Sequence, residues 1–158
     1  MELSISRHIT YAEATRTSTG LPNDPDAKQL YAMQSVASKV FEPLRAWVGG
    51  PIQITSFFRC AAVNRKVGGA SNSQHVKGEA MDLDMDMIKG SKSNADLFRY
   101  IRANLPFDQL IWEFGNTINP NWVHVSYRAS GGNRGQVLIA RKSAGRTVYL
   151  EVKSGQKV

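Results

Sequence analysis

Three histidines, thirteen carboxylates and one cysteine carry most of the reactive chemistry of this chain. His75 lies in a polar, glycine-rich loop, and Asp82 follows it in a segment where apolar and acidic residues alternate. Gly78 allows the loop to turn back, so the side chains of His75 and Asp82 can converge on one point. His124 lies in the middle of a predicted strand, which holds its side chain toward one face of a sheet.

Two imidazoles and one carboxylate suit Zn²⁺ and leave its fourth tetrahedral position open, as in catalytic zinc sites. The spacing of the three residues also fits a surface His75, a packed His124 and a solvated acidic strand face. From spacing alone, a zinc site formed by His75, Asp82 and His124 is therefore a hypothesis with an open alternative.

Hydrolysis at such a site needs a base and a group that stabilises the developing oxyanion. Glu113 is a candidate base: if it faces His124 across a hairpin, the two Cβ atoms lie about 5 Å apart on one sheet face. Its alternative role is a solubility charge on an edge strand. Arg59 follows a predicted strand among aromatic residues, a context that would hold its guanidinium near a pocket, although an isolated arginine is more often a surface charge.

Cys60 offers a competing mechanism, in which a thiolate nucleophile works with a histidine. A free cysteine is usually a small buried hydrophobe, and Cys60 lies at the predicted start of a helix with apolar neighbours. We therefore do not favour it as a nucleophile. As the single cysteine of the chain it also excludes an intramolecular disulfide.

The elements that must position these residues follow from hydrophobic periodicity and turn residues. Apolar residues at helical spacing predict a long helix over 26–47, kinked or divided at Pro43, and shorter helices over 60–67 and 93–106. Strands are predicted over 51–56, 79–87, 108–114, 121–127, 136–141 and 147–152. In the second of these, Asp82, Asp84 and Asp86 share one face and methionines and a leucine the other. The helices come mainly first, which favours an α+β fold.

The net charge of +7 is concentrated at one end of the chain. Residues 1–127 hold 13 basic and 12 acidic residues, whereas residues 128–158 hold seven basic residues and one acidic residue. The basic end is either a solvated hairpin or a surface that attracts an anionic polymer, nucleic acid or bacterial cell wall. The nearly neutral body lacks a basic and aromatic stripe, so we expect no specific nucleic-acid binding.

A chain of 158 residues, 42% of them hydrophobic, fits one ordinary domain with a packed core and excludes a disordered chain. Its apolar runs are too short to span a bilayer. Residues 1–20 carry Arg7 and Glu13 and lack an apolar h-region. We therefore expect no membrane insertion, no secretory signal peptide and synthesis in the cytoplasm.

Several segments, in order along the chain, resemble the M15 zinc peptidases, specifically the phage and bacterial branch similar to D-Ala-D-Ala carboxypeptidases and L-alanyl-D-glutamate endolysins. The resemblance runs from about residue 8 to 128, and the runs 8–16 and 42–45 belong to it. Its main motifs are Ile-Thr-Ser-Phe-Phe-Arg over 54–59, Asn-Arg-Lys-Val-Gly-Gly over 64–69, Ser-Gln-His-Val-Lys-Gly-Glu-Ala-Met-Asp over 73–82, Phe-Asp-Gln-Leu-Ile-Trp-Glu-Phe over 107–114 and Trp-Val-His-Val-Ser over 122–126.

The resemblance implies that His75, Asp82 and His124 hold Zn²⁺. It further implies that Arg59 polarises or binds the substrate and that Ser73 positions the substrate or a metal ligand.

The general base is less directly implied. In much of the family it is an acidic residue three positions before the last histidine, and here that position is Asn121. Either Glu113 takes over as the base, or the site binds zinc and substrate without efficient turnover. We favour Glu113, because its own segment belongs to the resemblance.

The resemblance implies a zinc-dependent peptidase that hydrolyses an amide bond in the peptide stem or cross-link of peptidoglycan. Such a protein would be a phage endolysin or a related murein hydrolase, acting on the wall after release or as a virion component. The alternative is a non-catalytic cell-wall-binding or virion structural module that retains the peptidase fold.

The implied fold is similar to that of hedgehog and D-Ala-D-Ala peptidase domains. We expect one α+β domain with a central antiparallel sheet, helices packed on one side and the zinc site on the sheet face. Residues 1–128 would form the peptidase domain and residues 129–158 a basic β-hairpin extension of the same domain. We expect a monomer.

Overall fold

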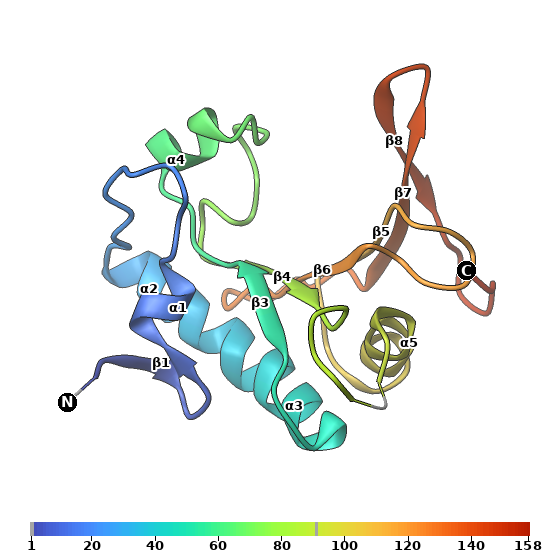
Figure 1. Ribbon diagram of the computed structural model, residues 1–158, viewed down its shortest axis with the longest axis horizontal. Helices are drawn as coiled ribbons and strands as arrows, with labels where there is room; N and C mark the ends of the chain where they lie inside the picture. Colours follow the sequence, from blue (N-terminus) through green and yellow to red (C-terminus); the bar gives the residue numbers. More distant parts are fainter. Residues whose placement is uncertain (1, 91) are drawn as a thin grey trace.

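A six-stranded sheet forms the centre of the computed structural model, which describes residues 2–90 and 92–158 (Figure 1). The strands lie in the order β3-β4-β6-β5-β7-β8. Their bounds are β3 Gln53–Ser56, β4 Ala80–Asp84, β5 Gln109–Glu113, β6 Trp122–Ser126, β7 Gln136–Ser143 and β8 Arg146–Glu151. The predicted strands are all present, most of them a residue or more shorter than the sequence pattern indicates.

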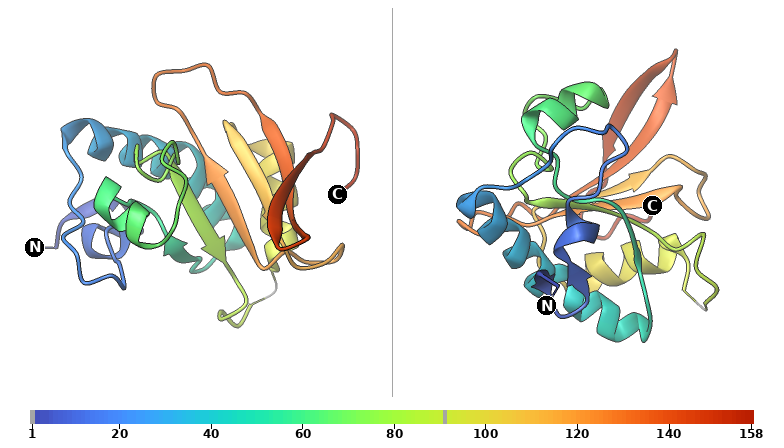
Figure 2. Two further views of the ribbon diagram at one scale, coloured as in Figure 1. Left: turned by 90° about the horizontal axis from the view of Figure 1, so that it is seen from above. Right: turned by 60° about the vertical axis from the view of Figure 1, so that its left-hand side comes forward.

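The longer helices cover one side of this sheet, and a short helix lies on the other side (Figure 2). The helical segments are α1 Tyr11–Ala14, α2 Ala27–Val36, the π-helix η1 Ala37–Phe41, α3 Glu42–Val48, α4 Ala61–Lys66 and α5 Asn94–Asn104. A small second sheet near the amino terminus consists of β1 Ser4–Ser6 and β2 Ile9–Thr10. The expectation of helices on one side holds for α2, α3 and α5, whereas α4 lies across the sheet from them.

The predicted long helix is divided near Pro43, as its sequence indicates. It begins with a capping box between Asp26 and Gln29. The single π turn of η1 separates α2 from α3, and Pro43 lies in the first turn of α3. Proline lacks an amide hydrogen and its ring clashes with the preceding turn of a regular α-helix. The wider π turn lets the chain continue without a break.

Strand alternation separates the core from the opposite sheet face. In β4, Met81 and Leu83 are fully buried against the helices, whereas Asp82 belongs to the other face. The alternation stops earlier than predicted, because β4 ends at Asp84 and Met87 is 81% exposed. The side chain of Asn94 accepts a hydrogen bond from the Met85 amide and donates one to the Asp84 carboxylate. These bonds replace strand pairing, so the strand ends there. The helix side carries most of the core.

The expectation of an antiparallel sheet is wrong for one pair of strands. β5 pairs with β7 in parallel, with Leu110 opposite Val137 and Trp112 opposite Ile139, so the sheet is mixed. The chain leaves β6, passes the start of β5 through residues 127–135 and then runs beside β5 in the same direction. Alternating residues identify a strand but do not specify which neighbour it pairs with.

A buried carboxylate holds this connection in place. Asp108 is fully buried and accepts hydrogen bonds from the Arg134 amide at 3.0 Å, from its guanidinium at 3.1 and 2.8 Å, and from Gln74 at 3.0 Å. Arg128 lies 3.3 Å from the same carboxylate. Burial alone would raise the pKa of Asp108, but the hydrogen bonds from Arg134 outweigh it and lower the pKa to about 2. Asp108 thus joins the 127–135 connection to the loop that carries His75.

We expect Asp108→Asn to destabilise the fold by about 2–4 kcal/mol at pH 7, because two arginines would lose their buried partner. The pKa of Asp108 is about 2 in the folded protein and near 3.8 without the fold. The ionised carboxylate therefore stabilises the protein above about pH 4, and this contribution is lost as the pH falls toward 2. Urea unfolding at pH 7 and pH 3 measures both effects. The exposed Asp86→Asn is the control, and equal stability of the two variants would contradict the role given to Asp108.

Within residues 2–90 and 92–158, no helix has the length and apolar character needed to cross a membrane.

Candidate functional site

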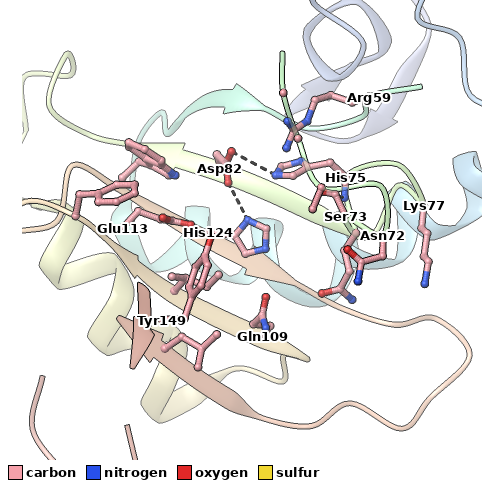
Figure 3. Close-up of a pocket in the computed structure, with 18 of the residues that line it drawn as sticks. Arg59, Asn72, Ser73, His75, Lys77, Asp82, Gln109, Glu113, His124 and Tyr149 are labelled. Atoms are coloured by element: carbon pink, nitrogen blue, oxygen red, sulfur yellow. Dashed lines mark hydrogen bonds and ion pairs between the residues drawn. The ribbon is translucent and has the colours of Figure 1, made fainter. Parts of the chain in front are cut away.

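His75, Asp82 and His124 meet on the sheet face that is turned away from α2, α3 and α5 (Figure 3). Asp82 in β4 lies directly opposite His124 in β6, so the two side chains share one face. The Asp82 Oδ1 atom lies 3.0 Å from His124 Nδ1, and its Oδ2 atom lies 3.3 Å from His75 Nε2. One donor atom from each of the three residues lies within 4.8 Å of the others. The structure therefore brings these residues to one point.

The loop before β4 fixes the ring of His75. The imidazole is 2% exposed, and its Nδ1 lies 2.7 Å from the carbonyl oxygen of Phe57. A carbonyl only accepts hydrogen bonds, so Nδ1 carries a proton and Nε2 is the ring atom that faces Asp82. A proton or a cation between Nε2 and the carboxylate would hold the two groups together. This arrangement fits a metal ligand held by a backbone carbonyl.

The carboxylate of the cluster is ionised. Burial opposes the charge of Asp82, but the neighbouring His75 and His124 outweigh it and hold its pKa well below the usual range. Two imidazoles and one anionic carboxylate are a donor set for divalent transition metals rather than for calcium or magnesium. The three residues could therefore hold a metal ion.

Glu113 lies at the end of β5 on the same sheet face, but it does not face His124. The register places Trp122 opposite Glu113 and Ile111 opposite His124, so the predicted pairing is wrong by two residues. Glu113 is instead a diagonal neighbour of His124, a position that long side chains still span. Its side chain points into the pocket of the cluster.

The surroundings of Glu113 favour the protonated form of its carboxyl group. The residue is 7% exposed. Burial raises the pKa of Glu113 to about 7; the negative charge of Asp82 adds to the rise and His124 opposes it. A carboxyl group with this pKa both accepts and releases protons near neutral pH.

Arg59 and Ser73 line the same pocket. The Arg59 amide donates to the carbonyl oxygen of His75 at 3.3 Å, which places the arginine beside the cluster. Its Nε atom is buried and, within the described part of the chain, has no hydrogen-bond partner. Ser73 Oγ accepts a hydrogen bond from the His75 amide at 3.3 Å, so it helps to shape the loop under His75.

Gly69 leaves the space that Arg59 and Asn64 occupy. A Cβ atom at position 69 would clash with the Asn64 carboxamide and would lie 3.1 Å from Arg59 Nη1. Asn64 is 2% exposed and donates to the carbonyl oxygen of Ala70. Residues 64–69 thus help to position the side chain of Arg59. The sequence of this run does not by itself predict that role.

The pocket around the cluster has a volume of about 680 Å³ and contains several residues that the sequence analysis does not single out. They come from the loop before β4, from the sheet and from the chain after β6. These further lining residues include Gln74, Gln109, Trp122, Arg128, Arg134 and Tyr149. Arg128, Arg134 and Tyr149 belong to the basic end of the chain. The charge of that segment does not by itself predict that it lies next to the cluster.

The competing candidates lie elsewhere. Cys60 donates its thiol hydrogen to the carbonyl oxygen of Pro22 and is absent from the described residues that line the pocket. His8, the third histidine of the chain, is also absent from the described lining residues, and its ring lies 2.7 Å from the carboxylate of Glu42. Asn121, three residues before His124, donates its backbone amide hydrogen to the carbonyl oxygen of Glu113.

Comparison with known proteins agrees with this geometry. No curated protein matches the chain. A family model described as Peptidase M15 matches residues 7–126, a segment that contains Arg59, His75, Asp82, Glu113 and His124 and ends before β7. Since the match covers most of the chain and the whole cluster, the protein belongs to the M15 peptidase family.

Proposed function

We propose that this M15 peptidase is a zinc-dependent enzyme that hydrolyses an amide bond in the peptide stem or cross-link of peptidoglycan. The observation that carries the proposal is the placement of buried Glu113 in one pocket with His75, Asp82 and His124. The resemblance of its motifs to those of phage and bacterial endolysins supports this substrate class, and with it a role as an endolysin or related murein hydrolase.

His75, Asp82 and His124 would hold the zinc ion. The carbonyl oxygen of Phe57 orients His75, and Asp82 provides the negative charge of the donor set. A bound zinc ion would polarise the scissile carbonyl and lower the pKa of a water molecule toward 7.

Glu113 would act as the general base. It would take a proton from the attacking water and pass it to the leaving amine, because a pKa of about 7 suits both steps. Asn121 cannot accept a proton. Among the described residues that line the pocket, Glu113 is the one carboxyl group apart from Asp82.

Arg59 would donate hydrogen bonds to the oxyanion or to a substrate carboxylate. Its planar guanidinium binds such groups through two parallel bonds. Its position in the lining of the pocket, next to His75, supports a role in binding a ligand oxygen. Ser73 would keep the His75 loop in position.

A non-catalytic wall-binding or virion module remains the second candidate, favoured by Asn121 at the position of the family's acid. The raised pKa of Glu113 favours the enzyme instead, because a binding module gains nothing from a buried carboxyl group at that position.

The test is incubation of the purified protein with purified peptidoglycan, with added zinc and after chelation, followed by mass spectrometry of new amine and carboxyl termini. Cleavage that requires zinc is the expected result. If the protein sediments with the sacculi but releases no new termini under either condition, the binding module is correct and the enzyme is not.

We further propose that residues 129–158 act as a basic extension that attracts the anionic wall. Arg128 and Arg134 already pair with Asp108, so they are not free for this purpose. The exposed basic residues of the β7–β8 hairpin are Arg141, Lys142 and Arg146.

Changing these three residues to glutamine is expected to lower activity on whole sacculi about three- to tenfold at low salt, with little effect at high salt or on a small peptide. Turnover of both substrates at several salt concentrations measures this. The matched control removes three exposed charges from the body, in Lys28→Gln/Lys39→Gln/Lys89→Gln. Equal losses on sacculi and on the small peptide would show that the hairpin acts as part of the fold or site instead.

A further inference from the structure

The C-terminal hairpin contributes a tyrosine to the pocket. Tyr149 in β8 lies opposite Ala140 in β7, and Ala140 lies opposite Glu113 in β5. Residues directly opposite one another share a sheet face, so the three form a row that leads to the cluster. Ala140 is fully buried and small, which leaves room for the tyrosine ring above it. Figure 3 shows Tyr149 pointing toward Glu113 and His124.

The side chain of Tyr149 contributes little to the packing of the fold. Tyr149 is 53% exposed, and its hydroxyl has no hydrogen-bond partner among residues 2–90 and 92–158. Both neighbours along β8, Val148 and Leu150, are exposed as well. A partly exposed tyrosine with a free hydroxyl, directed into a pocket, is placed to contact a ligand.

The surrounding charges decide what kind of ligand atom the hydroxyl would meet. Partial burial and the negative charges of Glu113 and Asp82 raise the pKa of Tyr149, so the hydroxyl stays neutral and is a hydrogen-bond donor. The carboxylate of Glu113 would repel a negatively charged group at this position, whereas a metal ion held by Asp82 would offset the charge of that residue. A neutral peptide carbonyl oxygen therefore fits best as its acceptor. Arg59 lies on the other side of the cluster, where an anionic group is favoured (Figure 3).

We propose that Tyr149 is a substrate-binding residue of the peptidase, which donates its hydroxyl hydrogen to a backbone carbonyl oxygen of the peptide on the Glu113 side of the pocket. The inference rests on the proposed function. It extends the site beyond the family-matched segment 7–126, because β8 lies outside that segment. The hairpin would then contribute to substrate binding directly, in addition to its charge.

The test compares Tyr149→Phe, which removes only the hydroxyl, with Tyr149→Ala, which also removes the ring. The substrate is a purified muropeptide from a muramidase digest of peptidoglycan. We expect Tyr149→Phe to raise KM about three- to tenfold and Tyr149→Ala to raise it further, with kcat within about twofold, since a lost substrate contact weakens binding. The matched control is Leu150→Ala, which changes a residue on the opposite face of the same strand. We expect its kcat and KM to stay within about twofold of the wild-type values.

A second measurement is independent of turnover. Calorimetric binding of the same muropeptide to Glu113→Gln protein, with and without Tyr149→Phe, is expected to give a Kd weaker by the same factor in the double variant. Unchanged KM and Kd in both Tyr149 variants would overturn the inference, as would equal effects of Leu150→Ala. If the wild type binds but does not cleave, the proposed function fails, and the Kd comparison alone decides the role of Tyr149.

Discussion

Replacing Asp82 with asparagine is expected to lower kcat/KM on peptidoglycan fragments by about a thousandfold and to abolish metal binding. Asp82 lies between His75 and His124 and contributes the negative charge of the cluster. Without it, two neutral imidazoles would have to hold a divalent cation alone. Loss of the several kcal/mol that a bound metal supplies to the transition state corresponds to about three powers of ten in rate.

Chelation of the wild type is expected to reproduce this loss, and added zinc should restore the activity of the wild type but not of Asp82→Asn. The metal content of each purified protein, measured by mass spectrometry, is the second readout. Asp86→Asn, which changes an exposed carboxylate after β4, is the control for the loss of one negative charge. An Asp82→Asn protein that keeps both its metal and its turnover would exclude the cluster as the metal site.

The meeting of these three residues could be predicted because it depends on local patterns. Alternation in β4 puts Asp82 opposite the core face, and the mid-strand position of His124 puts its ring on the sheet face that Asp82 occupies. The convergence of His75 needs only a loop that turns back, and Gly78 has the positive φ of 75° that this turn requires.

The register of the β5–β6 hairpin could not be predicted as easily. The connection contains Phe114 and Gly115, both with positive φ, and the backbone around Gly115 passes so close to Asn119 and Pro120 that a side chain would not fit. This tight turn shifts the pairing by two residues from the expected one. A shift of two keeps every side chain on its face, so Glu113 stays in the site; a shift of one would have turned it into the core.

The parallel pairing of β7 with β5 has no local signature, and it determines much of the remaining site. It brings Tyr149 to the pocket and makes Arg134 a partner of buried Asp108. From the sequence, Arg134 is counted as one charge of the basic C-terminal segment, because the sequence does not show which carboxylate pairs with it. The contact between Arg134 and Asp108 and the position of Tyr149 in the pocket can therefore be identified only from the three-dimensional structure.

Replacing Glu113 with glutamine is expected to lower kcat about 100- to 10,000-fold, the usual effect of losing a general base, while the metal stays bound. The pH dependence has a definite sign. The base works in its ionised form, and its pKa is raised to about 7, so kcat/KM of the wild type should rise with pH and level off above about 7. Initial rates on a muropeptide between pH 5 and 9 measure this, and the residual activity of Glu113→Gln should lack that rise.

Stability separates the loss of a base from the loss of the fold. The pKa of Glu113 is about 7 in the folded protein and near 4.5 without the fold, so its ionisation opposes folding increasingly as the pH rises from 4.5 through 7. Glu113→Gln is therefore expected to be more stable than the wild type at pH 8, by about 2 kcal/mol in urea unfolding, and closer to it at pH 5. An inactive but stabilised variant is the signature of a carboxyl group kept buried for catalysis. If Glu113→Gln keeps full activity while Asp84→Asn loses it, the base is not Glu113.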